Sequence, residues 1–106
     1  MVQQVRRIRN YPALVLWAGN NEIFQGIQSW GWSSDKYKKD YKKVFEEHIL
    51  KVVLNESPYI PYVPSSPVKG VGNGGFERGG DVHYWGVWAG GAAFENYEFA
   101  VGPFNS

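Results

Sequence analysis

Apolar residues recur at helical spacing at the start of the chain. Val2, Val5 and Ile8 stand three residues apart among glutamines and arginines, a spacing that predicts the last turns of a helix. We expect this helix to end before Pro12, because proline pushes the residue before it out of the α region.

A second and longer helix is predicted from about Ser34 to Leu54, with Ser33-Ser34-Asp35 supplying an N-cap. Lysines and glutamates fill most of its other positions, so the lysine run is interpreted as a solvated helix face. The apolar positions follow spacings of three, four and seven: Tyr37, Tyr41, Val44, Phe45, Ile49, Val52 and Val53.

Shorter apolar runs between these helices predict strands. Ala13–Trp17 is a continuous run, typical of a strand that is covered on both faces. Tyr62-Val63 predicts a short strand, since the prolines around it forbid a longer regular one. Between them, Gly19–Ser34 is interpreted as a loop that lies over the end of the first strand.

The second half of the chain predicts a loop, a strand and a short helix. Val68–Gly80 is rich in glycine and is interpreted as an exposed loop. In Asp81–Trp88 a strand would send Asp81, His83 and Trp85 to one face. Ala92–Val101 predicts a short helix. Strands that alternate with helices favour βα units and a parallel sheet, so we expect an α/β fold.

Composition excludes several classes of function. The 106 residues fit one domain at most, the formal net charge is +1 and cysteine is absent, which excludes a disulfide framework and thiolate chemistry. The near-neutral charge gives no electrostatic reason to expect nucleic acid or an acidic membrane as a partner, and no apolar run approaches the roughly 20 residues that span a bilayer.

Aromatic residues make up 17% of the chain. They are efficient core fillers, and composition alone favours this interpretation, but their flat faces also suit the stacking of sugar rings. The segment Trp17–Glu22 favours sugar chemistry. Its carboxyl group follows a predicted buried strand, where barrel enzymes carry catalytic residues, and the amide of Asn21 suits a sugar hydroxyl. Glu22 is therefore a candidate for half of a glycosidase acid/base pair.

Four segments together resemble the β-mannosidases of glycoside hydrolase family two: Val5–Pro12, Leu16–Glu22, Tyr62–Pro67 and Gly80–Trp88. Sister enzymes that act on galactosides and glucuronides share the Asn-Glu pair, whereas the double Asn and the His-Tyr-Trp cluster favour the mannosidase branch. The resemblance implies that residues 1–106 are a fragment of a (β/α)8 TIM-barrel catalytic domain, roughly strands four to six with their helices. Such an arc is not a closed barrel on its own, since a barrel typically needs about 250 residues.

The resemblance also implies roles for individual residues. Glu22 is the expected general acid/base of a retaining hydrolase that cleaves terminal β-mannosides, and Asn21 is expected to bind the 2-hydroxyl of the sugar. The expected walls of the sugar pocket are Trp30, His83 and Trp85, and Asp81 is expected to bond a hydroxyl or orient a neighbour. In the family a segment like Phe104-Asn105-Ser106 directly precedes the nucleophilic glutamate. We therefore expect the chain to lack this nucleophile, and Asp81 is a less favoured substitute for it.

Further expectations follow from this interpretation. The fragment alone is expected to be inactive and marginally stable, with the remainder of the parent barrel as its natural partner and self-association as an alternative, because open strand edges invite pairing. No cofactor or metal is expected. In the intact enzyme, burial and a nearby carboxylate should raise the pKa of Glu22. A periplasmic or secreted location is favoured over a cytoplasmic one. The alternatives are a carbohydrate-binding module, a purely structural arc, or a β-galactosidase or β-glucuronidase relative.

Overall fold

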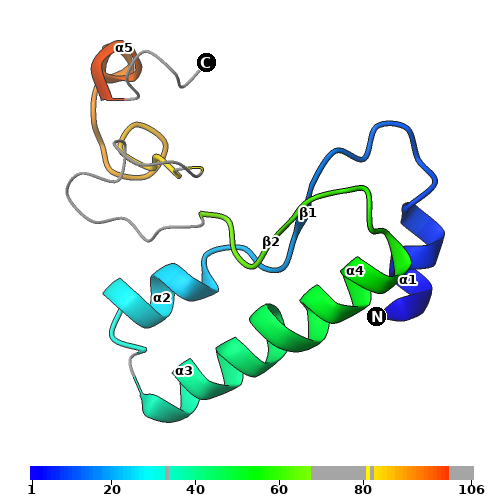
Figure 1. Ribbon diagram of the computed structural model, residues 1–106. Coiled ribbons are helices and arrows are strands. Elements are labelled where there is room, and N and C mark those ends of the chain that lie inside the picture. The colour runs from blue at the N-terminus through cyan, green and yellow to red at the C-terminus, as the bar shows by residue number, and fades with distance from the viewer. Residues whose placement is uncertain (33, 68–80, 82, 101–106) are drawn as a thin grey trace.

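The computed structural model describes residues 1–32, 34–67, 81 and 83–100. In Figure 1, helices lie along one side of a pair of short strands, and the C-terminal segment with α5 (Tyr97–Ala100) lies away from the long lower helix, above and to the left of the strands. The elements in chain order are α1 (Val2–Ile8), β1 (Trp17–Ala18), α2 (Ile23–Ser29), α3 (Asp35–Tyr41), η1 (Lys42–Ile49), α4 (Leu50–Glu56), β2 (Tyr62–Val63), η2 (Phe94–Asn96) and α5 (Tyr97–Ala100).

Both predicted amphipathic helices are confirmed. The first is α1, which ends at Ile8 and so before Pro12, as expected. The second is formed by α3, η1 and α4, which follow one another without a break and appear as one long helix in Figure 1. The hydroxyl of Ser34 caps it by accepting a bond from the Tyr37 amide at 3.1 Å. Its middle part, η1, is a π-helix, a feature that the apolar spacing did not predict.

The expected strand from Ala13 to Trp17 is wrong over most of its length. Only Trp17 and Ala18 are strand residues, and Val15 is 76% exposed. The prediction assumed a strand that is covered on both faces. Within the described residues, however, β2 is the one strand paired with β1, so most of the run lacks such a cover. The two strands are parallel, with Trp17 opposite Tyr62 and Ala18 opposite Val63. The short second strand and the parallel pairing are therefore confirmed.

Two other sequence-based expectations are corrected. Gly19–Ser34 is not only loop, because it contains the helix α2. Gly26 allows this helix to meet Trp32 closely, since a Cβ at that glycine would lie 2.3 Å from the indole ring. The second correction concerns Asp81–Trp88, where the described residues form an irregular segment and a turn in place of a strand.

The short helix expected over Ala92–Val101 is present as η2 and α5. The predicted loop Val68–Gly80 and the terminal Phe104-Asn105-Ser106 lie outside the described residues.

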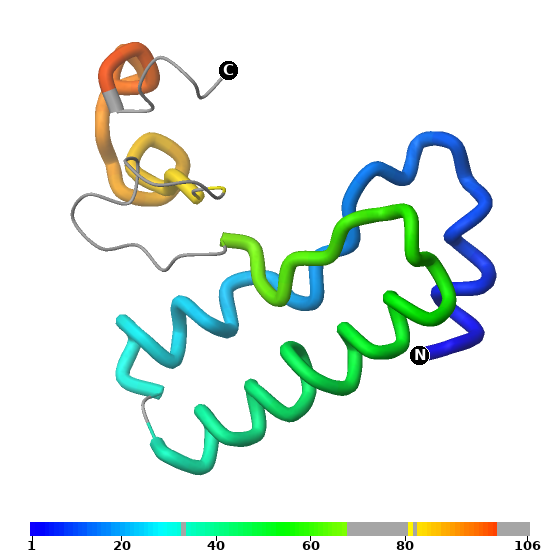
Figure 2. The backbone as a smooth tube through the Cα atoms, in the orientation of Figure 1, coloured from blue at the N-terminus to red at the C-terminus, as the bar shows by residue number. Residues whose placement is uncertain are grey.

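The core is small for a chain of this length. Among the described residues, the buried hydrophobic side chains are Val5, Ile27, Tyr41 and Val53. The radius of gyration is 16.0 Å, compared with about 13 Å for a compact chain of this size. The tube in Figure 2 accordingly follows an open path, with the C-terminal segment standing away from the long helix.

An open arrangement of this kind agrees with a part of a larger α/β domain. The assignment of its strands to the fourth to sixth strands of a barrel stays a prediction. None of the described helices combines the length and the apolar character needed to cross a membrane.

Candidate functional site

The ends of the two parallel strands meet at one edge. The ladder of backbone hydrogen bonds continues past both strands, from the Gly19 amide to the Val63 carbonyl at 2.9 Å and from the Ser66 amide to the Asn20 carbonyl at 2.9 Å. It ends where the Glu22 amide donates to the Ser66 carbonyl at 2.8 Å. Main-chain hydrogen bonds thus hold Glu22, the predicted catalytic residue, beside Ser66, which lies 44 positions later in the sequence.

Asn20 holds the turn that carries Glu22. Its Oδ1 accepts a bond at 3.0 Å from the amide of Ile23, the first residue of α2, and its Nδ2 donates to the Pro64 carbonyl at 2.7 Å. The hydroxyl of Ser65, which is fully buried, donates to the same Oδ1 at 2.9 Å. Within this frame Glu22 adopts a left-handed backbone conformation with φ of 62°. This conformation is uncommon outside glycine and asparagine and is a frequent feature of functional turns.

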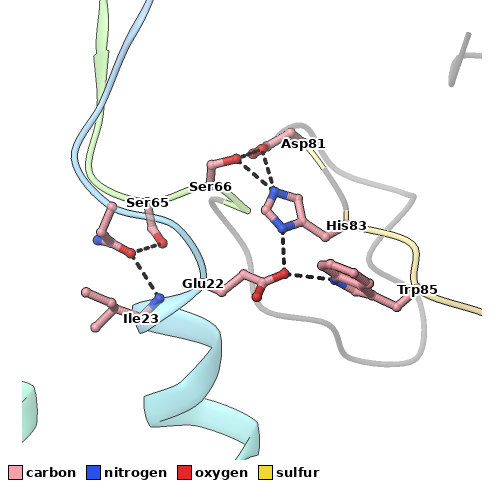
Figure 3. Close-up of polar contacts among 8 residues, drawn as sticks. Glu22, Ile23, Ser65, Ser66, Asp81, His83 and Trp85 are labelled. Carbon is pink, nitrogen blue, oxygen red and sulfur yellow. Dashed lines mark hydrogen bonds and ion pairs between the residues drawn. The ribbon is translucent and has the colours of Figure 1, made fainter. Parts of the chain in front are cut away.

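The carboxylate of Glu22 meets two N–H donors from the C-terminal segment (Figure 3). Nδ1 of His83 lies 2.8 Å from its Oε1, and Nε1 of Trp85 donates to the same oxygen at 2.9 Å. The Glu22 side chain is 13% exposed and that of His83 is 22% exposed. The contact therefore joins two largely buried side chains that lie 61 residues apart in sequence.

The other face of His83 is bound by Ser66 and Asp81 (Figure 3). Nε2 of His83 lies 3.0 Å from the Ser66 hydroxyl and 3.7 Å from a carboxylate oxygen of Asp81. The Ser66 hydroxyl in turn donates to that Asp81 oxygen. The imidazole ring thus stands between two carboxylates, with a serine as the direct link to the second.

These contacts set the charge state of Glu22. The hydrogen bond from His83 lowers the pKa of the Glu22 carboxyl most, the bond from Trp85 lowers it further, and burial opposes both. The sequence predicted a raised pKa in an intact enzyme, whereas the direction in this chain is the opposite. The raised pKa concerns an intact enzyme with a second carboxylate and stays a prediction, whereas in this chain two N–H donors on one oxygen outweigh burial.

The structure brings together most, but not all, of the predicted site residues. Glu22, Asp81, His83 and Trp85 form one cluster, and Asn21 stands beside it with an exposed side chain. Trp30 lies at the opposite end of α2 from Glu22, edge-on to the Trp32 ring at 5.3 Å.

Sequence reasoning missed three polar residues of this site: Asn20, Ser65 and Ser66. Ser65 and Ser66 follow directly after the predicted strand Tyr62-Val63. The rule that parallel strands end at the same edge of a sheet could therefore have placed them beside the end of β1.

Among the hollows of the described residues, one borders the cluster and another lies beside α2. An open one of about 400 Å³ is lined by His83, Tyr84, Trp85 and Trp88. A second, apolar groove of about 500 Å³ runs between α2 and the long helix, with Ile27, Trp32 and Tyr41 among its lining residues. The described residues contain no group of three or more His, Asp or Glu side chains placed to hold a metal ion.

Comparison with known proteins finds β-mannosidases among the relatives of this chain. Beta-mannosidase B of Thermothelomyces thermophilus is 33% identical over 98% of this chain, and the beta-mannosidase of Mus musculus is 30% identical over 77% of it. A crystal structure of a beta-D-mannosidase from Dictyoglomus thermophilum is 31% identical and covers 91% of the chain with a TM-score of 0.73. The chain spans only 14% of the first relative, 11% of the second and 12% of the third. No protein-family model matches the chain.

Proposed function

We propose, since the chain belongs to the β-mannosidases of glycoside hydrolase family two, that it carries the acid/base portion of an active site that cleaves terminal β-mannosides with retention of configuration. The observation that carries this proposal is the position of Glu22. It stands at the shared end of two parallel strands, its backbone is held by a main-chain ladder, and its side chain is bound by His83 and Trp85.

The chemistry needs this residue in two protonation states. As a general acid, Glu22 gives a proton to the oxygen of the leaving group, and as a general base it later takes a proton from the water that hydrolyses the glycosyl-enzyme. The lowered pKa of Glu22 favours the ionised form, which is the form needed for the second step. A second carboxylate about 5–5.5 Å away, which retention requires, would raise that pKa and prepare the first step.

The substrate pocket draws on the neighbouring side chains. We assign the 2-hydroxyl of the sugar to Asn21, which precedes Glu22 in the chain, and sugar stacking to Trp85, whose indole is half exposed beside the 400 Å³ hollow. Asp81 is bonded to Ser66 and faces His83, which supports an orienting role over that of a substitute nucleophile. The remainder of the barrel would supply the nucleophile and close the pocket.

The test is a chimera in which this chain replaces the matching segment of the Dictyoglomus thermophilum enzyme. With Glu22→Gln we expect turnover of an aryl β-mannoside to fall by about 10²- to 10⁴-fold, the usual contribution of a general acid or base. Added azide should restore turnover and yield the β-mannosyl azide, because an anionic nucleophile attacks the glycosyl-enzyme without a base. The matched control is Glu56→Gln, since Glu56 pairs with Arg6 at the far end of the long helix. Full activity in the Glu22→Gln chimera would exclude the acid/base role.

A second candidate function is carbohydrate binding without catalysis. It is favoured by the exposed indole of Trp88, which is 80% exposed at the rim of the same hollow. Titration of the chain with a β-mannobioside, followed through the indole N–H resonances, separates the two functions. Saturable binding by the isolated chain would favour a binding role, and the absence of binding would favour a site that needs the rest of the barrel.

A further inference from the structure

The hydrogen bonds around His83 indicate how many protons its ring carries. The hydroxyl of Ser66 has one hydrogen, and it donates that hydrogen to the Asp81 carboxylate, which can only accept when ionised. Ser66 can therefore interact with Nε2 of His83, 3.0 Å away, only as an acceptor. It follows that Nε2 carries a hydrogen.

The same reasoning applies to the other nitrogen. Nδ1 of His83 lies 2.8 Å from Oε1 of Glu22, and an ionised carboxylate accepts but does not donate. Nδ1 therefore carries a hydrogen as well. When Glu22 and Asp81 are both ionised, the contacts are satisfied by an imidazolium ring that donates to each side, and its positive charge lies between two negative ones.

The contacts of Glu22 also distinguish its two oxygens. Oε1 accepts from both His83 and Trp85, at 2.8 Å and 2.9 Å. A carboxylate oxygen offers about two lone-pair sites, so these two donors occupy Oε1. A proton that reaches Glu22 without displacing either donor must bind Oε2.

From these contacts we propose that His83 is a positioning residue that directs the exchangeable proton of Glu22 to Oε2, and that Asp81, acting through Ser66, keeps His83 in the doubly protonated form needed for this. The proposal rests on the acid/base function proposed above and adds how that function is oriented. As an acid, Glu22 then breaks its Oε2–H bond, and as a base it forms that bond again with a proton from water. The N–H of His83 stays in place throughout.

Among the residues that the structure describes, the charged groups paired with His83 are Glu22 at the start of α2 and Asp81. Asp81→Asn removes the negative charge that faces Nε2 and replaces a carboxylate by a weaker acceptor, so the hydrogen of Ser66 can turn toward Nε2. We therefore expect Asp81→Asn to convert His83 to a neutral ring that carries its hydrogen on Nδ1 alone. The Ser66–Nε2 contact would persist with donor and acceptor exchanged.

The experiment is nitrogen NMR of the whole chain with labelled histidine, recorded at neutral pH without any sugar. His48, which is exposed on η1, is removed as His48→Gln so that the remaining signals belong to His83. Two protonated nitrogens resonate close together, whereas the nitrogens of a neutral ring resonate far apart. We expect the close pair in the parent chain and separated signals in Asp81→Asn. Asp40→Asn, which removes an exposed carboxylate that pairs with Lys36, should leave the close pair unchanged.

The carboxyl carbon of Glu22 provides an independent measurement. Trp85→Phe removes one donor from Oε1, so the titration midpoint of Glu22 should move to higher pH while the nitrogen signals of His83 keep their close pair. Widely separated nitrogen signals in the parent chain, while Glu22 is ionised, would overturn the proposal without any variant having to fold. An unchanged pattern in Asp81→Asn would overturn the part assigned to Asp81. Neither result depends on sugar hydrolysis, so a failure here is distinguishable from a failure of the acid/base function.

Discussion

Replacing Asn20 with alanine tests whether the turn before α2 is held by one side chain. Asn20 accepts a bond from the Ile23 amide at the start of α2, donates to the Pro64 carbonyl and accepts from the Ser65 hydroxyl. Each of these three hydrogen bonds is worth about 1 kcal/mol. Because neighbouring bonds are not additive, we expect Asn20→Ala to lower the free energy of unfolding by about 2–3 kcal/mol.

The assay is equilibrium unfolding in urea, followed by circular dichroism and by tryptophan fluorescence. The matched control is Asn21→Ala, because Asn21 is the same residue type, is adjacent in the chain and has an exposed side chain. Surface substitutions of this kind usually change stability by less than about 0.5 kcal/mol. If the two alanine variants unfold at the same urea concentration, the reasoning is wrong and the main-chain ladder alone holds the turn.

Three further predictions concern other parts of the structure. Gly19→Ala should destabilise the chain and disturb the strand pair, because a Cβ there would lie 2.3 Å from the Tyr62 hydroxyl and 2.6 Å from the Pro64 carbonyl. Thermal unfolding measures this loss of stability. A Tyr62→Phe background should restore only part of it, because the Pro64 carbonyl remains. The pKa of Glu22 is lowered in the folded chain, so its contribution to stability is present above the pKa of the unfolded chain and is lost as the pH falls through the folded value. Urea midpoints from pH 7 to pH 3 should therefore fall more steeply in the parent than in Glu22→Gln, and parallel curves would contradict this. Ser34→Ala removes the N-cap of the long helix and should cost about 1 kcal/mol, whereas Ser29→Ala at the exposed end of α2 serves as the control.

The helices could be predicted from the sequence because their signals are local. Val2, Val5 and Ile8 lie on one helix, and Ser34 is a cap residue that is followed by an amphipathic pattern. The prediction of a strand over Ala13–Leu16 was wrong. An apolar run indicates that a segment can be buried, but it does not indicate whether another element covers that segment. Val15 is exposed, since the described part of the chain offers β1 a single partner strand.

The sequence predicted which residues belong to the site better than it predicted the contacts between them. Glu22, His83, Trp85 and Asp81 could be singled out from chemistry and resemblance, and they do lie together. Ser66 was missed because its role depends on the register between β1 and β2, which no local pattern encodes. The raised pKa predicted for Glu22 in an intact enzyme stays a prediction. The lowering of this pKa in the present chain could not be foreseen for a related reason. It depends on two donors from a segment more than sixty residues away, and their distance from one oxygen is a property of the tertiary structure.

The bond between His83 and Glu22 closes a loop of 61 residues, which gives it a use apart from sugar chemistry. Local helix formation alone cannot produce this bond, since the two residues belong to segments that meet only when the C-terminal half docks on the strand ends. The nitrogen resonances of His83 therefore report whether the C-terminal segment has docked on the strand ends. During refolding they should reach their final positions after the helical signal has recovered, and they offer a direct readout of whether added pieces of a parent protein complete the docked state.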